Sequence, residues 1–534
     1  MSGYSFITSG VPRQPGESKW KYNIRKSFTI KSLASVDDDA KNSTLNKELG
    51  VFDLLMIGLG GIIGSGIFVL TGEVAGTKAG PAVVISFILA GITASFSALS
   101  YSELASMIPV SGSTYTYAYA TMGELVAWII GWDLTLEYLV GASAVAVGWS
   151  GYFVYLFSDG FNIEFSNSWT SAPITYNNTL GKFEIVPGAY FNVPAFVIVI
   201  LLTILLIIGI KESSRVNTMV VSVKLIVLTI FCIAAGIYVD PKNYSPFIPP
   251  NEGSFSQFGF TGVLAGTSVV FFAFIGFDSI STTSQEARNP QRDIPIAIMS
   301  SFGIVTVFYI SVCLVLTGVV NYKLFANDPA PLSIAAKETG MQWLGIFVDI
   351  GAICGLISVI LVLLMGQPRI FLAMANDGLF FPKLASKIHP RFKTPYITTA
   401  VCGLLCATIA ALFPISILAE LTSVGTLLAF FIVNIGVIIL RFTAPDAPRK
   451  FRVPGGPFLF PLMGALLDLL LLVTSSKASI ERLFIWMAIG LLIYGLYGRN
   501  HSKANNFNKI KFNNVGIDVM EMENIDDIIK TSKN

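Results

Sequence analysis

The feature that most constrains this chain is its series of long apolar runs, many of about 20 residues or more. A helix needs about 20 consecutive apolar residues to cross roughly 30 Å of hydrocarbon. Charged residues make up only 13% of the chain, against roughly 25% in soluble domains, so little polar surface is left to face water. The sequence therefore predicts an all-α polytopic membrane protein embedded in a lipid bilayer.

The length rule predicts about twelve membrane spans. Their expected limits are 51–77, 80–107, 122–157, 192–210, 215–238, 260–286, 294–319, 343–374, 396–412, 416–441, 457–475 and 481–498. Residues 111–121, SGSTYTYAYAT, fit either a short helix or a loop. The expected domains are a polar tail over 1–50, a transmembrane domain over 51–498 and a second tail over 499–534. This last tail is rich in asparagine and lysine, a composition typical of disorder.

Basic residues near the ends of the spans predict the orientation, because Lys and Arg are enriched in cytoplasmic connections. The N-terminal tail is basic, and the even-numbered connections hold Lys211, Arg215, Arg288, Arg292, Lys383, Lys387, Arg391, Lys393, Arg441, Arg449, Lys450 and Arg452. Both termini are therefore expected in the cytoplasm. The sequence leaves open whether the membrane is the plasma membrane or that of a vacuole or lysosome.

Two N-glycosylation sequons fall in connections that this orientation places outside the cytoplasm. Asn177 opens the sequence NNT, and Asn243 opens the sequence NYS. Both asparagines are expected to accept a glycan. The sequon at Asn42 lies in the cytoplasmic tail and is expected to stay unmodified.

The composition also excludes several functional classes. The net charge is +2, so no overall field favours nucleic acid. The five cysteines lie in apolar runs without a CxxC pattern, and the two histidines lie in polar connections, so no metal site or cofactor is expected. Neither HExxH nor GxSxG occurs, which argues against an enzyme.

The first span contains a glycine-rich stretch, GLGGIIGSGIFVLTG, over residues 58–72. Glycine costs about 1 kcal/mol in a helix relative to alanine. A break at Gly64, Ser65 and Gly66 would expose N–H groups at the start of a half-helix, where a carboxylate can bind. Alternatively, the glycines allow close packing between helices, since Gly60 and Gly64 have the small-xxx-small spacing.

The sixth span has a matching interruption at Gly276 and Asp278, within FFAFIGFDSIS over residues 271–281. Interrupted spans at corresponding positions of two halves are typical of secondary transporters, which bind substrate at the interruptions. An offset of five spans reverses the topology of the second half. We therefore expect inverted repeats over about 51–238 and 260–441, followed by extra helices over about 457–498.

Five stretches carry a resemblance to a known family. They are GLGGIIGSGIFVLTG, SYSELASMIPVSGSTYTYAY, GELVAWIIGWDLTLEY, FIGFDSISTTSQEARNPQRDIP and MGQPRIFLAMANDGLFFP, the last over residues 365–382. In this order they are similar to the amino acid–polyamine–organocation superfamily and, within it, most to the cationic amino acid transporter family. The resemblance covers about residues 50–498. It implies a five-plus-five inverted-repeat fold in which the first and sixth helices are broken.

The same resemblance implies where an L-amino acid binds. The implied substrate-binding residues are Ile62, Gly64, Ser65, Gly66, Phe272, Ile275 and Gly276. The carboxylate would meet the backbone around Ser65 and Gly66, and a side chain at Gly66 would occupy its space. The amino group would meet the main-chain carbonyls of Ile62, Phe272 and Ile275. Phe272 is expected either to gate the site or to pack as an ordinary aromatic residue.

Lys224 lies near the middle of the fifth span, in MVVSVKLIVLTIF, where a charge is costly and marks a functional candidate. The alternative is that its side chain reaches an interface, against which its distance from both ends of the span argues. In proton-coupled relatives a lysine at this motif position takes the place of a sodium ion. The resemblance therefore implies that Lys224 couples transport to protons, with Ser358 of the eighth span as its partner.

Acidic residues provide further candidates. Asp133 and Glu137 share one helical face, and Glu137 is expected either to meet a cationic side chain or a proton, or to form a buried structural pair. Asp278 is expected either to cap the half-helix after the break or to act on substrate or proton. Structural roles are expected for Glu103 and for a cytoplasmic charge network of Glu286, Arg288 and Arg292.

These observations favour a secondary active transporter that moves L-amino acids by alternating access, with proton coupling. Cationic substrates such as arginine, lysine and ornithine are expected. The alternatives are a broad or neutral amino acid permease and an amino-acid-sensing receptor of the same fold. An ion channel is disfavoured, because no filter repeat or ring of charges is present.

Overall fold

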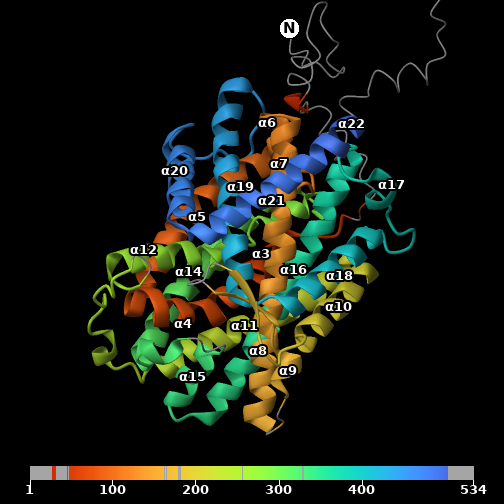
Figure 1. Ribbon diagram of the computed structural model, residues 1–534. Helices are drawn as coiled ribbons and strands as arrows, with labels where there is room; N and C mark the ends of the chain where they lie inside the picture. The colour runs from red at the N-terminus through yellow and green to blue at the C-terminus, as the bar shows by residue number, and fades with distance from the viewer. Residues whose placement is uncertain are drawn as a thin grey trace, which may run out of the picture.

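The computed structural model of the protein describes residues 27–31, 45, 47–161, 163, 165–177, 182–254, 257–326 and 330–502. Over these ranges it is a bundle of helices with one two-stranded sheet in a connection (Figure 1). Most of both predicted tails, including the region predicted to be disordered beyond residue 502, lies outside the described residues.

The described residues contain eight helical runs that are long and apolar enough to cross a membrane, together with three shorter apolar helices. The first run, Val51–Met107, is 57 residues long and holds two spans. The chain breaks between them at Gly80, whose φ of +62° lies in the left-handed region that favours glycine. The twelve predicted spans and the all-α membrane fold are therefore confirmed.

The spans begin and end close to their predicted limits. In chain order they are α3 (Val51–Ile62) with η1 (Gly66–Leu70), α4 (Thr71–Val74) and η2 (Ala75–Ala79); α5 (Val83–Met107); α7 (Glu124–Thr135) with η4 (Leu136–Val140) and α8 (Gly141–Phe161); α10 (Val193–Ile208); α11 (Ile210–Gly236); α12 (Gly259–Val270) with η6 (Phe271–Phe274) and α13 (Ser279–Thr282); α14 (Pro290–Val319); α16 (Gln342–Asn376); α18 (Tyr396–Leu412); α19 (Ile415–Thr443); α20 (Leu459–Thr474); and α21 (Lys477–Ile493) with η9 (Tyr494–Gly498).

Short elements fill the connections. They are η3 (Gly80–Ala82), α6 (Ser113–Thr121), α9 (Asn167–Thr170), β1 (Ile174–Asn177), β2 (Lys182–Ile185), η5 (Pro241–Tyr244), η7 (Ser284–Glu286), η8 (Tyr322–Phe325), α15 (Pro331–Glu338), α17 (Pro382–Ala385) and α22 (Arg499–His501). The strands pair antiparallel, with Ile174 opposite Ile185.

The ambiguous stretch over residues 111–121 forms a helix, α6, rather than a loop. All nine of its residues are buried, and it packs against α7 and α19. Nine helical residues rise only about 14 Å, too short to cross a bilayer. The helix therefore lies inside the bundle without adding a span.

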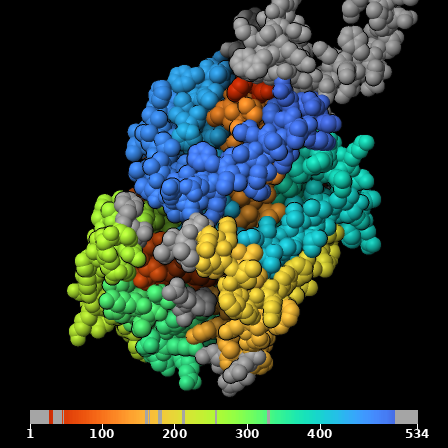
Figure 2. All heavy atoms as spheres, viewed as in Figure 1, coloured from red at the N-terminus to blue at the C-terminus, as the bar shows by residue number. Residues whose placement is uncertain are grey.

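Burial separates central spans from peripheral ones. In the sixth span 78% of the apolar window is buried, against 22% in the twelfth, so the sixth runs through the middle of the protein. Large apolar side chains of α20 and α21, such as Leu466 and Phe484, are exposed and suit contact with lipid. On the face shown in Figure 2, later spans in green, cyan and blue cover much of the first ones, whose dark red atoms are visible between them.

The helices form two packing groups. In one, α5 packs on α12 and α14, and α14 packs on α3. In the other, α16 packs on α8 and α11, and α10 packs on α18. The first group consists of the first two spans of each predicted repeat, which is the correspondence that an inverted repeat requires.

The predicted orientation can be tested by glycosylation. Asn177 is the last residue of β1, and the rest of its sequon lies outside the described residues. Asn243 lies in η5, where its side-chain amide donates to the Gly318 carbonyl at 2.8 Å. In a eukaryotic membrane system we expect replacement of Asn177 or Asn243 by glutamine to remove a glycan-dependent mass shift. Asn42→Gln should leave the mass of the protein in this assay unchanged. A glycan on Asn42 would show that the orientation is the reverse of the predicted one.

Candidate functional site

The first predicted break is present. The α3 helix ends at Ile62, Ile63 has an extended backbone, and the helix resumes at Ser65. The Gly64 carbonyl accepts the N–H groups of Ile67 and Phe68, each at 3.1 Å. The N–H groups of Ser65 and Gly66 come earlier in this first turn and therefore have no intrahelical acceptor.

Ser65 adds a further free donor at the same place. Its side chain is only 1% exposed, and its hydroxyl has no hydrogen-bond partner in the part of the chain that the structure describes. A buried polar group without a partner is costly unless a ligand satisfies it. Together with the N-terminal end of the second half-helix, this hydroxyl forms a place suited to an anion.

The second predicted break is also present. The η6 helix ends at Phe274, Ile275 is extended, and Gly276 has a φ of +118° that L side chains rarely adopt. The chain becomes α-helical again at Ser279. Both interrupted spans predicted from the sequence are therefore confirmed.

The two breaks touch each other through their backbones. A Cβ atom on Gly276 would lie 2.6 Å from the carbonyl carbon of Gly61, and one on Gly66 would lie 2.3 Å from the Cβ of Ala273. Close packing, the alternative interpretation for Gly60 and Gly64, is also present, since added Cβ atoms there would lie 2.5 Å from Asn217 Oδ1 and 2.4 Å from Val359 Cγ2. A side chain at Gly66 was expected to occupy the space of the substrate carboxylate. The structure shows that its Cβ would instead point at Ala273, so the first clash would be with the second break.

Tyr309 of α14 joins the two breaks, a role that the sequence did not suggest. Its buried hydroxyl lies 2.7 Å from the Ile62 carbonyl oxygen and 2.6 Å from that of Ala273. One hydroxyl proton serves two carbonyls, one from each broken span. The sequence does place this tyrosine in the middle of an apolar run, a position that could have indicated a buried hydroxyl with a polar partner.

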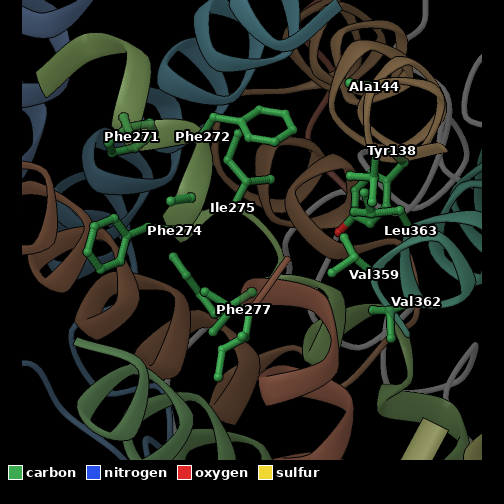
Figure 3. Packing of buried hydrophobic residues seen from close by; sticks show 14 of the residues in the cluster. Tyr138, Ala144, Phe271, Phe272, Phe274, Ile275, Phe277, Val359, Val362 and Leu363 are labelled. Carbon is green, nitrogen blue, oxygen red and sulfur yellow. The ribbon is translucent and has the colours of Figure 1, made fainter. Parts of the chain in front are cut away.

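A cavity lies between the breaks and the third, eighth and tenth spans. It is lined by Gly61, Ile62, Gly64, Ser65, Gly66, Glu137, Gly141, Val145, Phe272, Ile275, Val359, Leu363 and Thr422. Figure 3 shows Phe272 and Ile275 of the sixth span on one side and Val359 and Leu363 on the other. Of the seven residues expected to bind substrate, all but Gly276 line this cavity, and Gly276 contacts the lining residue Gly61.

The carbonyls expected to meet an amino group are partly engaged. The Ile62 carbonyl accepts from Tyr309, and the Phe272 carbonyl accepts the N–H of Ile275 at 3.2 Å. Each carbonyl oxygen has a second lone pair, so both can still accept from a ligand. Phe272 is 6% exposed and lines the cavity, which places its ring where the predicted gate would be.

Lys224 has the partners expected of it. It is fully buried, and its Nζ donates to the Ile63 carbonyl at 2.7 Å, the Gly60 carbonyl at 3.1 Å and Ser358 Oγ at 2.8 Å. The lysine does not reach an interface. It ties the fifth span to the break of the first span and to the eighth.

Glu137 faces the cavity with neither carboxyl oxygen hydrogen-bonded. It lies in η4, a π-helical turn inside the third span, and such turns are frequent at functional sites. Asp133, one turn earlier, is fully buried and also has no hydrogen-bond partner. Glu137 therefore makes no hydrogen bond to Asp133 among the described residues, and its nearest acidic neighbour is Asp278 of the sixth span.

Asp278 does not cap the half-helix, which corrects one of the two expectations for it. No side-chain capping bond is made at α13. Its Oδ2 instead accepts the hydroxyl of Tyr138, and its carboxyl lies close enough to that of Glu137 for the two to interact. The carboxyl of Asp278 points to the third span, where the Tyr138 hydroxyl is its donor.

Ion pairs close the end of the bundle that is predicted to be cytoplasmic. Glu103 accepts two bonds from Arg441, at 2.7 and 2.5 Å, and a third from Arg449 at 3.2 Å, which agrees with a structural role. Glu286 forms a two-point pair with Arg369, both bonds being 2.9 Å. The network expected with Arg288 and Arg292 is thus replaced by a link from Glu286 to the eighth span.

The comparison with known proteins decides the family. The family model described as "Amino acid permease" matches residues 49–494. The chain belongs to the amino acid permease family. The sequence resemblance to the amino acid–polyamine–organocation superfamily is thereby confirmed.

Individual relatives of this permease have names that refer to different substrates. The branched-chain amino acid permease BcaP of Bacillus subtilis (strain 168) is 44% identical over 91% of this chain and 100% of that protein. The methylthioribose transporter of the same organism is 43% identical over 90% of this chain and 99% of that protein. Human cationic amino acid transporter 4 is 38% identical over 84% of this chain and 68% of that protein. All three are named as permeases or transporters, which confirms that the chain is not an enzyme.

Proposed function

We propose that this permease moves L-amino acids with cationic side chains across its membrane by alternating access, coupled to protons through Lys224. The observation that carries the substrate class is Glu137. Its buried carboxyl lines the same cavity as the free donors of Ser65 and has no cationic partner among the described residues. A bound cationic side chain would supply that partner.

The backbone of the two breaks would recognise the part that all L-amino acids share. The substrate carboxylate would bind at the N–H groups of Ser65 and Gly66 and at the Ser65 hydroxyl. Its ammonium group would donate to the carbonyls of Ile62, Phe272 and Ile275. Both ends of the substrate would then be held by main-chain atoms that a change of side chain leaves in place.

The acidic groups near the cavity favour a cation at its far wall. Asp133, Glu137 and Asp278 are buried, and none forms an ion pair in the described part of the chain. An uncompensated buried charge is strongly destabilising. A substrate ammonium or guanidinium beside Glu137, or a proton on the carboxyl, would remove this cost.

A neutral substrate is the second candidate, and the rest of the cavity wall favours it. Val145, Phe272, Ile275, Val359 and Leu363 present an apolar surface that suits a branched aliphatic side chain. One relative is named for branched-chain amino acids. In this case Glu137 would take up a proton instead of pairing with the substrate.

Competition for uptake distinguishes the two candidates. In liposomes with purified permease, we expect arginine, lysine and ornithine to compete better than leucine, valine and alanine. Glu137→Gln should weaken competition by arginine about tenfold to a hundredfold, since a hydrogen bond to a charged group contributes about 1.5–3 kcal/mol. Competition by leucine should change little.

Glu481→Gln is the matched control, because that carboxylate is exposed and lies at the surface. Better competition by leucine than by arginine, unchanged in Glu137→Gln, would establish the neutral candidate. Counterflow of labelled substrate by the wild type would exclude a receptor that binds without transport.

A further inference from the structure

Asp468 is a second buried acid that the proposed transport mechanism does not use. It lies in α20, the eleventh span, in the apolar run GALLDLLLLV. Its side chain is fully buried. An ionisable residue inside a span is costly to keep and is a functional candidate for that reason.

The carboxyl of Asp468 belongs to a polar cluster that joins three spans. Its Oδ2 accepts from the Asn434 amide at 2.9 Å and from the Ser97 hydroxyl at 3.2 Å. The Asn434 amide also donates to Ser97 Oγ at 2.9 Å, and Ser100 donates to Asn434 Oδ1 at 2.6 Å. Asp468 Oδ1 has no partner.

No charged side chain faces this cluster from the helices that pack on α20. The α12 helix carries no titratable residue. On α5, Tyr101 bonds Thr114, and Glu103 pairs with Arg441 of α19. The remaining acidic residue of α19, Glu420, accepts from serines at the start of α21. Among the described residues, Asp468 therefore has hydroxyl and amide neighbours but no cation.

We propose that Asp468 is a proton-binding site whose occupancy changes during the transport cycle. Each group of the cluster can act as donor or acceptor: the hydroxyls of Ser97, which bonds the carboxyl, and of Ser100, which bonds Asn434, rotate, and the amide of Asn434 offers either its NH₂ or its oxygen. As a carboxylate, Asp468 accepts from the NH₂ group, as described above. As a carboxylic acid, it can donate its proton to the amide oxygen once that amide has turned over.

The same cluster is placed to sense movement of α5 against α19 and α20. Ser97 and Ser100 belong to α5, whereas Asn434 belongs to α19 and Asp468 to α20. Figure 1 shows α5, α19 and α20 side by side. If α5 shifts against α19 and α20, the donors on the carboxyl change, so proton binding and the conformation of the permease are linked.

A metal cation is a poorer match for this cluster. Hard cations take six or more oxygen ligands, whereas the bonded side chains here, those of Asp468, Asn434, Ser97 and Ser100, supply at most five oxygen atoms even with the amide turned over. We therefore assign the site to a proton. The test also measures whether the infrared band or counterflow depends on sodium.

The test is infrared difference spectroscopy combined with counterflow, both on the full-length permease in liposomes at equal pH on the two sides. A shift from high to low pH should produce the carbonyl band of a protonated carboxyl in the wild type. Asp468→Asn should lose this band. It should also lose the change of counterflow rate with pH that accompanies the band in the wild type. Added substrate should still raise the temperature at which the variant unfolds, which shows that the binding site is intact. Replacement of sodium by choline should change neither.

The neighbouring serines supply a variant that does not alter the acid. Ser97→Ala should shift the band and the pH profile, because it removes a donor from the carboxyl. Ser95→Ala, on the same helix but only half-buried and bonded to its own helix at Ile92, should not. An unchanged band and profile in Asp468→Asn, or a sodium dependence that this variant loses, would overturn the proposal. The role of Asp468 rests on the proposed transport function. The two can fail separately: absence of counterflow in the wild type would contradict transport, whereas the infrared band reports protonation of Asp468 directly.

Discussion

Replacement of Lys224 by methionine is expected to abolish pH-driven accumulation of substrate while some binding survives. An inward gradient of about one pH unit is equivalent to about 1.4 kcal/mol, enough for about tenfold accumulation at one proton per substrate. In the variant, the ratio of substrate concentration inside the liposomes to that outside should be about one. Methionine nearly preserves the length of the side chain but cannot donate to the carbonyls of Gly60 and Ile63. The measurement is uptake of labelled amino acid into liposomes with and without the gradient.

The physical reason is that one ammonium holds three spans together. When protonated, Lys224 joins the fifth span to the first break and to Ser358 of the eighth span. Loss of the proton weakens these bonds and lets the first span move. Lys224→Arg should also fail, because arginine keeps its proton at any physiological pH.

Thr229→Ala on the same helix is the control, since Thr229 is exposed and its hydroxyl bonds only within the helix. Full accumulation in both Lys224 variants would show that coupling, if present, uses another group.

Substitution of Gly66 by leucine is expected to reduce uptake to background. The added Cβ would lie 2.3 Å from the Cβ and 2.4 Å from the Cα of Ala273, distances at which the two breaks must separate. Overpacking of this kind costs about 1–3 kcal/mol, which a membrane bundle can tolerate without unfolding. It also moves the N–H donors of the first break away from the carbonyls of the second, so the two ends of a substrate could no longer be held together.

Gly303→Leu is the matched control, because an added Cβ there would meet no atom within 4 Å. Both variants should insert and purify as the wild type does. Wild-type uptake by well-folded Gly66→Leu would show that contact between the breaks is not needed for transport.

The spans and both breaks could be predicted because they depend on local properties of the chain. Run length identifies a span, and Gly64, Gly66 and Gly276 mark where a helix cannot continue cheaply. Lys224 could be identified for a similar reason, since a charge in mid-span must find partners. The resemblance then supplied Ser358.

The remaining contacts could not be predicted because they depend on which helix faces meet. Nothing local to Asp278 indicates that its donor is Tyr138, and nothing local to Glu286 indicates Arg369 instead of the nearby Arg288. Hydropathy measures how apolar a segment is without giving its rotation about the helix axis. Asp468 did carry a signal, an acid in a run of leucines, whereas the polar cluster around it required the tertiary structure.

The backbone contact between Gly61 and Gly276 has a consequence for how such a permease can acquire a new cargo. Gly276 cannot take a side chain without separating the breaks, and a Cβ on Gly61 would lie only 3.0 Å from the Gly276 carbonyl oxygen, so the part of the cavity nearest to them is fixed by main-chain atoms. Variation is confined to the opposite wall, where Glu137, Val145 and Leu363 lie on uninterrupted helical segments. A lineage can therefore change its preferred solute by exchanging a few wall residues while it inherits the machinery of the breaks unchanged.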